Sequence, residues 1–154
     1  MDLYCVQKIG PRFCAALVGD GVRDLQLYVA VGLLPHLRAH QQSPETSKRL
    51  MSHIECCQPA FQFLPRSFVL DLMDIWLKWL GQVDEEKKKE NGSWRDLVTR
   101  CSALIETIMD VILPVDQAFL AKRYWNIMYR ARKHGKPHEF EAKKHNLMYL
   151  LKSG

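Results

Sequence analysis

The chain has 154 residues, a length that suits one domain with one hydrophobic core and is short for two. Its composition, 47% hydrophobic and 25% charged with a net charge of +5, is that of a folded globular protein and excludes a disordered chain. The densest apolar run, Leu25 to Leu34, contains Gln26 and is too short to cross a bilayer, so we expect no membrane partner.

The first helix with clear signals begins after Asp20, a suitable N-cap. Before it, residues 3–9 are either a short helix or a strand, Gly10-Pro11 interrupts that element, and residues 13–18 are apolar enough for a buried turn of helix. Apolar residues then recur at helical spacing on two sides of the helix, namely Val22, Leu25, Val29, Leu33 and Leu37 on one and Leu27, Val31 and Leu34 on the other. We therefore expect a central, mostly buried helix that Pro35 kinks or ends near Leu33.

A second helix is predicted to start at Ser43, which can cap it, with Pro44 in the first turn and an inward stripe that includes Leu50 and Ile54. Pro59 and Pro65 then enclose an apolar connector, which we expect to fill part of the core as an irregular segment. A third helix is predicted from about residue 66 to residue 80, ended by Gly81, and residues 82–92 form an exposed, charged loop.

Three more helices follow with clearer boundaries. Ser93 and Asp96 form a capping box before a helix that Pro114 closes, with Leu97, Cys101, Leu104, Ile105, Ile108 and Ile112 as its stripe. The next runs from Asp116 to about His134 and stops at Gly135, ahead of Pro137. A shorter helix over residues 138–151 carries Phe140, Leu147 and Leu151 on one side.

No segment alternates apolar and polar residues as a strand would, so the fold class is all-α. We predict a single globular bundle over residues 1–154, with six to seven mostly antiparallel helices and the apolar, Pro-bracketed connector. No stop signal precedes Ser153-Gly154, so we expect that the chain can be the N-terminal part of a longer protein.

The five cysteines are an odd number with no framework spacing, and Cys56 and Cys57 are adjacent. The first residues also lack the basic start and apolar core of a secretory signal. We expect free thiols in an intracellular protein, nuclear or cytoplasmic, with the nucleus slightly favoured.

Local signatures of catalysis are lacking, because the sequence contains no phosphate-binding loop, no nucleophile elbow and no zinc-protease motif. Histidines four apart occur at His36 and His40, and His53 precedes Cys56 by three, but no Cys-x-x-Cys knuckle completes a zinc site. We therefore predict that the protein is no enzyme and needs neither a metal nor another cofactor.

The positive charge is concentrated near the C-terminus. Residues 120–154 contain nine Lys or Arg against two Glu, whereas the remainder has 13 basic and 15 acidic residues. On the wheel of the 116–134 helix, Leu120, Tyr124, Ile127, Met128 and Ala131 form the expected core stripe. Trp125 and Tyr129 fall near the opposite side, among cations, which is unusual for a face that meets only water.

We predict that this face binds an acidic or amphipathic partner segment, as in an adaptor or scaffold subunit of a larger complex. Its contact residues would be Lys122, Trp125, Tyr129, Arg130, Arg132 and Lys133. The alternative function is nucleic-acid binding, with the aromatics stacking on bases and Arg123, Lys136, Lys143 and Lys144 at phosphates. A structural alternative is that the last helix covers Trp125 and Tyr129 as second-layer core. The oligomeric state stays open.

Overall fold

Every regular element in the part of the chain that the computed structural model describes, residues 22–86 and 92–153, is a helix. The expectations for residues 1–21 and for residues 87–91 lie outside the described residues. The elements are α2 (Val22–Leu27), the π-helix η1 (Tyr28–Leu33), α3 (Leu34–Ala39), α4 (Pro44–Glu55), the 3-10 helix η2 (Gln58–Phe63), α5 (Arg66–Glu86), α6 (Ser93–Ile112), α7 (Val115–Lys133) and α8 (Pro137–Lys152).

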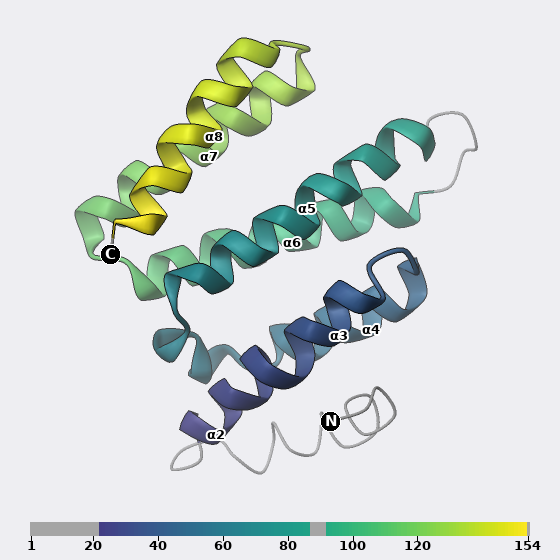
Figure 1. Ribbon diagram of the computed structural model, residues 1–154, viewed down its shortest axis with the longest axis vertical. Coiled ribbons are helices and arrows are strands. Elements are labelled where there is room, and N and C mark those ends of the chain that lie inside the picture. The colour runs from purple at the N-terminus through teal and green to yellow at the C-terminus, as the bar shows by residue number, and fades with distance from the viewer. Residues whose placement is uncertain (1–21, 87–91, 154) are drawn as a thin grey trace.

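The helices form antiparallel hairpins that stack in three layers (Figure 1). The first layer holds α2 to α4, the middle layer is the α5–α6 hairpin, and the third is the α7–α8 hairpin. The third layer contacts the middle one through α7 on α6 and α8 on α5, and the two hairpins diverge toward the α7–α8 turn. The predicted all-α bundle of mostly antiparallel helices is confirmed. None of the described helices is long and apolar enough to span a bilayer.

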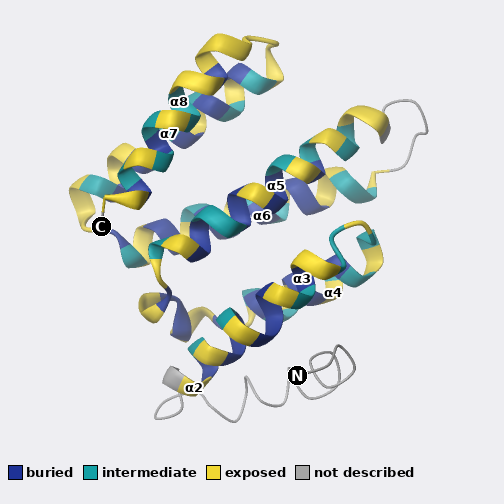
Figure 2. Ribbon diagram, in the orientation of Figure 1, coloured by how far each residue is buried: buried dark blue, intermediate teal, exposed yellow. Residues whose placement is uncertain are grey.

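The first described helix does not end near Leu33, as Pro35 had suggested, but continues to Ala39. Proline lacks an N–H and its ring clashes with a carbonyl one turn earlier, and η1 widens the helix immediately before it. The expected central position is also wrong, because Leu27 and Val31 are 54% and 69% exposed. The middle of the bundle belongs to α5 and α6, whose buried residues run along both helices (Figure 2).

The start of α4 is as predicted. The Ser43 side chain accepts a hydrogen bond from the Thr46 backbone N–H at 3.4 Å, and Pro44 opens the helix. The connector after it fills part of the core with Phe61 and Leu64, although it is a 3-10 helix rather than an irregular segment.

The third predicted helix continues past Gly81, so the expected loop over residues 82–92 is wrong for residues 82–86. A glycine within a helix costs only about 1 kcal/mol. Val83 packs against the core and Asp84 pairs with Arg132 of α7, which stabilises the extra turn. Gly81 and the charged residues after it therefore predicted an end of α5 that lies before the actual end at Glu86.

The stripe predicted for α6 is confirmed: five of its residues are buried and Ile112 is half-buried, and the helix ends before Pro114. The predicted capping residue is wrong by one position, since Gly92 is the N-cap and Ser93 is already in the first turn. Helix boundaries commonly differ by this amount, so the packing argument is unaffected.

The stripe assigned to α7 is right for Met128 and Ala131, which are buried, but wrong for Leu120 and for the exposed position given to Trp125, and this is the main correction. Trp125 has no exposed surface: its indole N–H donates to Ser102 Oγ of α6 at 3.0 Å, and its ring lies 4.5 Å from that of Trp76 on α5. By contrast Leu120, expected in the core, is 36% exposed. The residues of α7 that are buried are Ala118, Ala121, Trp125, Met128 and Ala131.

The reason is that α7 lies between two neighbours and presents a different face to each. Small residues at Ala118 and Ala121 allow its backbone to approach the α5–α6 layer, and Trp125 fills the space one turn later. Tyr124 lies on another side, where Lys143 of α8 reaches its ring. The structural alternative was therefore right about the burial of Trp125, whose hydrogen-bond acceptor lies on α6 and whose neighbouring aromatic ring lies on α5.

The turn between α7 and α8 is as predicted. Gly135 has a φ of +68°, and the Lys136 N–H donates to the Ala131 carbonyl at 2.8 Å, which closes a Schellman motif. Phe140, Leu147 and Leu151 are buried on α8, as expected.

We predict that Trp125→Ala lowers the free energy of unfolding by about 3–5 kcal/mol, because it removes a buried ring and leaves the Ser102 hydroxyl without its donor. Arg130→Ala, an exposed site one turn and a half later, is the matched control and should change stability by less than about 0.5 kcal/mol. Urea unfolding followed by circular dichroism measures both. A loss below about 1 kcal/mol for Trp125→Ala would contradict the assignment of Trp125 to the core.

A second prediction compares two glycines. Gly135→Ala should destabilise by about 1 kcal/mol, since alanine is strained at a φ of +68°. Gly81→Ala should stabilise by about 0.5–1 kcal/mol, because Gly81 is in the body of α5 and an added Cβ meets nothing within 4 Å. Thermal unfolding of the two variants gives the signs, and a stabilising Gly135→Ala would contradict the turn described here.

Candidate functional site

The structure separates the six predicted partner-binding residues into three groups. Trp125 is in the core and is unavailable. Lys122 is paired with Asp110 at 2.9 Å, on the first half of α7. The other four, Tyr129, Arg130, Arg132 and Lys133, lie together in the last turns of α7, where they line two adjoining depressions.

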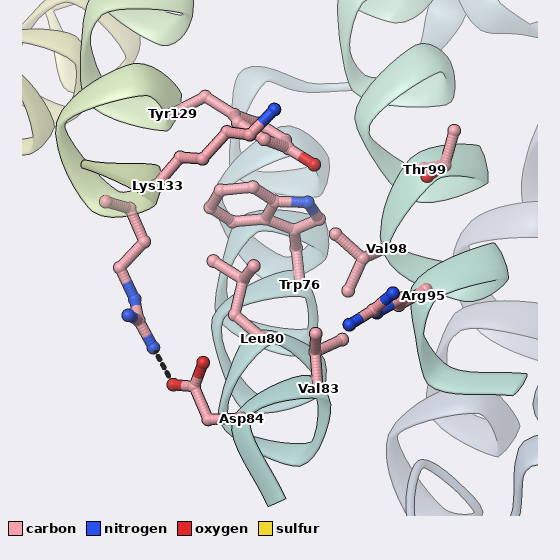
Figure 3. Close-up of a pocket in the computed structure, with 10 residues that line it drawn as sticks. Trp76, Leu80, Val83, Asp84, Arg95, Val98, Thr99, Tyr129 and Lys133 are labelled. Atoms are coloured by element: carbon pink, nitrogen blue, oxygen red, sulfur yellow. Dashed lines mark hydrogen bonds and ion pairs between the residues drawn. The ribbon is translucent and has the colours of Figure 1, made fainter. Parts of the chain in front are cut away.

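The first depression is a pocket of about 450 Å³ between the C-terminal end of α5, the N-terminal half of α6 and the C-terminal end of α7 (Figure 3). It lies where the α7–α8 hairpin diverges from the α5–α6 hairpin. Its lining consists of Trp76, Leu80, Val83, Asp84, Arg95, Val98, Thr99, Tyr129, Arg132 and Lys133.

The second depression, of about 380 Å³, continues from the first along α6 and α7. The two share Thr99, Tyr129 and Lys133, and the second adds Ser102, Ala103, Glu106, Asn126 and Arg130. Together they make a groove, named here the α6–α7 groove. From Arg95 to Glu106 it follows α6 for about 16 Å, which matches three turns of a docked helix.

The walls of the pocket are apolar. Leu80 and Val83 come from α5 and Val98 from α6, while the Tyr129 ring lies 5.3 Å from the ring of Trp76. In Figure 3 the Trp76 indole occupies the centre of the pocket, between Tyr129 and Val98. An apolar side chain that entered here would lose water contact on several sides, which is the physical basis of an anchor site.

The rim of the pocket is predominantly basic. Arg132 pairs with Asp84 across the mouth, from α7 to α5 (Figure 3). Arg95 and Lys133 form no ion pair with any other residue in the ranges 22–86 and 92–153. Three cations thus face one carboxylate, and the field in the pocket favours an anion.

Trp76 also carries a polar group without a partner. The buried indoles of Trp79 and Trp125 donate to the Gln41 carbonyl and to Ser102 Oγ, each at 3.0 Å, whereas Trp76 Nε1 is buried with no acceptor. Leaving such a donor unsatisfied costs about 1–3 kcal/mol. Among the buried indoles in the described part of the chain, the one without a hydrogen-bond acceptor, Trp76, is also the one that lines the pocket.

The four residues predicted at phosphates do not line the groove. Lys143 lies over the Tyr124 ring at 5.7 Å, and Lys144 lies over Phe140 at 5.6 Å while pairing with Glu141. Arg123 and Lys136 are exposed. The structure therefore separates the basic surface of α8 from the groove.

No cluster of three or more His, Cys, Asp or Glu with metal-binding geometry occurs in the described ranges. The His36 and His40 rings stack at 6.3 Å. Cys56 is exposed, Cys57 is buried, and Cys101 is a buried free thiol. Burial and the charge of Glu55 strongly raise the pKa of Cys101. Cys101 therefore stays a neutral thiol, which is a poor nucleophile and metal ligand.

Sequence reasoning missed Trp76, Asp84, Arg95 and Thr99 as parts of the site. Trp76 is in the core, but a core residue can also be the floor of a pocket. Asp84 lies inside the segment 82–92 that was predicted to be an exposed, charged loop, and Arg95 lies three residues after it. A signal was available in the 76–83 stripe, whose apolar residues continue past Gly81 at helical spacing.

Comparison of the chain with protein-family models, with curated proteins and with solved structures finds no match.

A prediction on pH concerns His53, one member of the pairs considered for metal binding. Burial lowers its pKa below the usual 6.5, so in mildly acidic solution the unfolded chain takes up a proton that the folded protein resists. The free energy of unfolding should therefore fall between about pH 7 and about pH 5, and His53→Gln should reduce that slope. Urea unfolding at several pH values measures it. An unchanged slope in the variant would show that His53 does not contribute.

Proposed function

We propose that the protein is a non-catalytic helical interaction module, an adaptor or scaffold subunit, that binds an acidic, amphipathic segment of a partner protein in the α6–α7 groove. The observation that carries this proposal is the combination of apolar walls and a rim in which three cations meet one carboxylate. Apolar walls provide affinity for aliphatic or aromatic side chains, and the excess of cations selects an acidic partner.

The composition of the groove supports a protein partner. Trp, Tyr and Arg are the residue types that dominate the binding energy of protein interfaces, and Trp76, Tyr129, Arg95 and Arg132 all line the pocket. A helix is the form of partner that fits best, because the groove runs between two helices over about three turns.

Nucleic-acid binding is the second candidate, and it rests on the exposed cations of the α7–α8 hairpin. Several of these are already engaged, since Lys143 and Lys144 lie over aromatic rings and Lys122 is paired with Asp110. The protein partner is therefore preferred.

The proposed place of action is the nucleus or the cytoplasm. Cys101 is buried as a free thiol, a state that a reducing compartment maintains. This thiol does not line the groove, so this part of the proposal is independent of the partner.

The test is a selection of peptides of about 15 residues displayed on phage against the full chain, followed by affinity measurement on the selected sequences. We expect enrichment of sequences with apolar residues three and four apart and with several Asp or Glu between them. The double variant Arg95→Glu with Lys133→Glu should weaken their binding by about tenfold or more. Arg49→Glu with Lys152→Glu makes the same change in charge away from the groove and should have little effect.

Three outcomes would contradict the proposal: selection of no peptide, selection of peptides without acidic residues, or equal loss of affinity in both double variants. Titration of single- and double-stranded oligonucleotides at two salt concentrations is run in parallel. Tight binding at low salt that weakens steeply with added salt, together with failure of the peptide selection, would support the nucleic-acid candidate instead.

A further inference from the structure

The unpaired indole N–H of Trp76 and the unpaired cations of the pocket rim suggest one recognition event. The donor is buried without an acceptor, and it belongs to a side chain in the centre of the pocket. Arg95 and Lys133 lack ion-pair partners among the described residues, and they line the same pocket. An oxygen acceptor with a negative charge would satisfy both kinds of group at once.

We propose that the pocket recognises a carboxylate on an apolar stem, the side chain of a Glu on the partner helix, and that Trp76 Nε1 donates a hydrogen bond to it. One carboxylate oxygen accepts from the indole, and the other faces Arg95 and Lys133. This inference rests on the proposed function and names the partner group that the groove selects.

The size and polarity of the pocket favour a carboxylate over other anions. Leu80, Val83 and Val98 provide apolar contacts for a stem of a few methylene groups. A phosphate dianion is larger and holds its water more strongly, so burial beside these side chains would cost more than its few donors return. A neutral amide can accept from the indole but gains nothing from the cations.

Access to the donor requires a small rearrangement. Trp76 is buried in the free protein, and the side chains at its borders include Tyr129 and Thr99, which are partly buried and exposed respectively. The indole nitrogen therefore becomes accessible only when side chains that line the pocket change conformation on binding. The binding event should therefore perturb Trp76, Tyr129 and Thr99 together, and leave Trp79 and Trp125 in place.

Asp84 has a defined role in this scheme. Its carboxylate is already paired with Arg132 at the mouth of the pocket, so it reduces the charge available from that arginine. Asp84→Asn removes this competition, and we expect it to increase affinity for a carboxylate ligand. Asp74→Asn, on the same helix but paired within it to Lys78, is the matched control.

The experiment is a titration of the full chain, labelled with ¹⁵N-tryptophan, with 4-methylpentanoate and with its isosteric amide. The indole region of the spectrum reports each tryptophan separately, and Trp76→Phe identifies the resonance of Trp76. We expect 4-methylpentanoate to move the Trp76 indole proton downfield in a saturable manner, with the amide about tenfold weaker or worse. Resonances of Trp79 and Trp125 should move little.

Arg95→Gln and Lys133→Gln should each weaken binding of the acid and leave binding of the amide unchanged. If Trp76→Phe does not fold, Thr99→Ala and Tyr129→Phe identify the Trp76 resonance through the shift that they cause in it. Equal affinity for acid and amide, a Trp76 resonance that stays in place, or no binding of the acid would each overturn the inference.

The selected peptides separate this inference from the proposed function. Selected peptides that lose affinity in the double variant Arg95→Glu with Lys133→Glu are thereby shown to bind the groove. If such a peptide does not move the Trp76 resonance, the indole–carboxylate contact is refuted and the proposed function is not. A single Glu→Gln substitution in the peptide that reduces affinity about tenfold and abolishes the downfield shift would support it. A further set of peptides carries no Glu or Asp, so that the C-terminal carboxylate is the only acid. If these peptides bind more tightly than peptides with an internal Glu, the assignment of the carboxylate to a side chain is overturned.

Discussion

The docking of Trp125 onto the middle layer determines the geometry of the C-terminal half of the protein. The indole contacts α5 through its ring and α6 through its N–H, and it is therefore the contact that fixes α7 to both helices of the α5–α6 hairpin. The two small residues before it bring the first half of α7 close to that layer. Beyond Trp125, α7 diverges, and the space that opens is lined by Trp76 and Tyr129.

The same constraint explains why the site has its particular chemistry. Because Trp125 fills the core side of α7, Tyr129 one turn later and Arg132 and Lys133 two turns later lie at the edge of the core rather than inside it. Trp76 then has a neighbour on either side but no acceptor for its N–H. The groove, with the unsatisfied Trp76 N–H at its floor, thus results from the divergence of the α7–α8 hairpin from the α5–α6 hairpin. Among the residues that the structure describes, the walls of the groove are helices, and no irregular loop contributes to them.

Much of the fold could be predicted from the sequence where the chemistry is local. Ser43-Pro44 and Gly135 mark a helix start and a helix stop through their own backbone and capping preferences, and both are confirmed. The stripe of α6 was correct because one broad apolar face has only one way to be buried. The predicted start of α6 was wrong by one residue and the predicted end of α5 by about six, since tertiary contacts stabilise α5 beyond Gly81.

The candidate site was predicted only in part, and the reason is the treatment of alanine. Ala118 and Ala121 have little apolar surface, so a stripe drawn through the bulky residues of α7 passed them over, although close helix packing depends on them. The error placed Trp125 on the surface. Tyr129, Arg132 and Lys133 were nevertheless correctly grouped, because they follow Trp125 on one side of the helix at the point where the two layers separate. The sequence alone offered no means to see that Trp76 lacks an acceptor.

The most direct measurement is a set of intermolecular NOEs between an acidic peptide that binds the chain and the methyl groups of the protein. If the α6–α7 groove is the binding surface, apolar protons of the peptide should show NOEs to the methyls of Leu80, Val83 and Val98, which line the pocket. NOEs confined to methyl groups on the outer side of α8, with none to these three residues, would contradict the account.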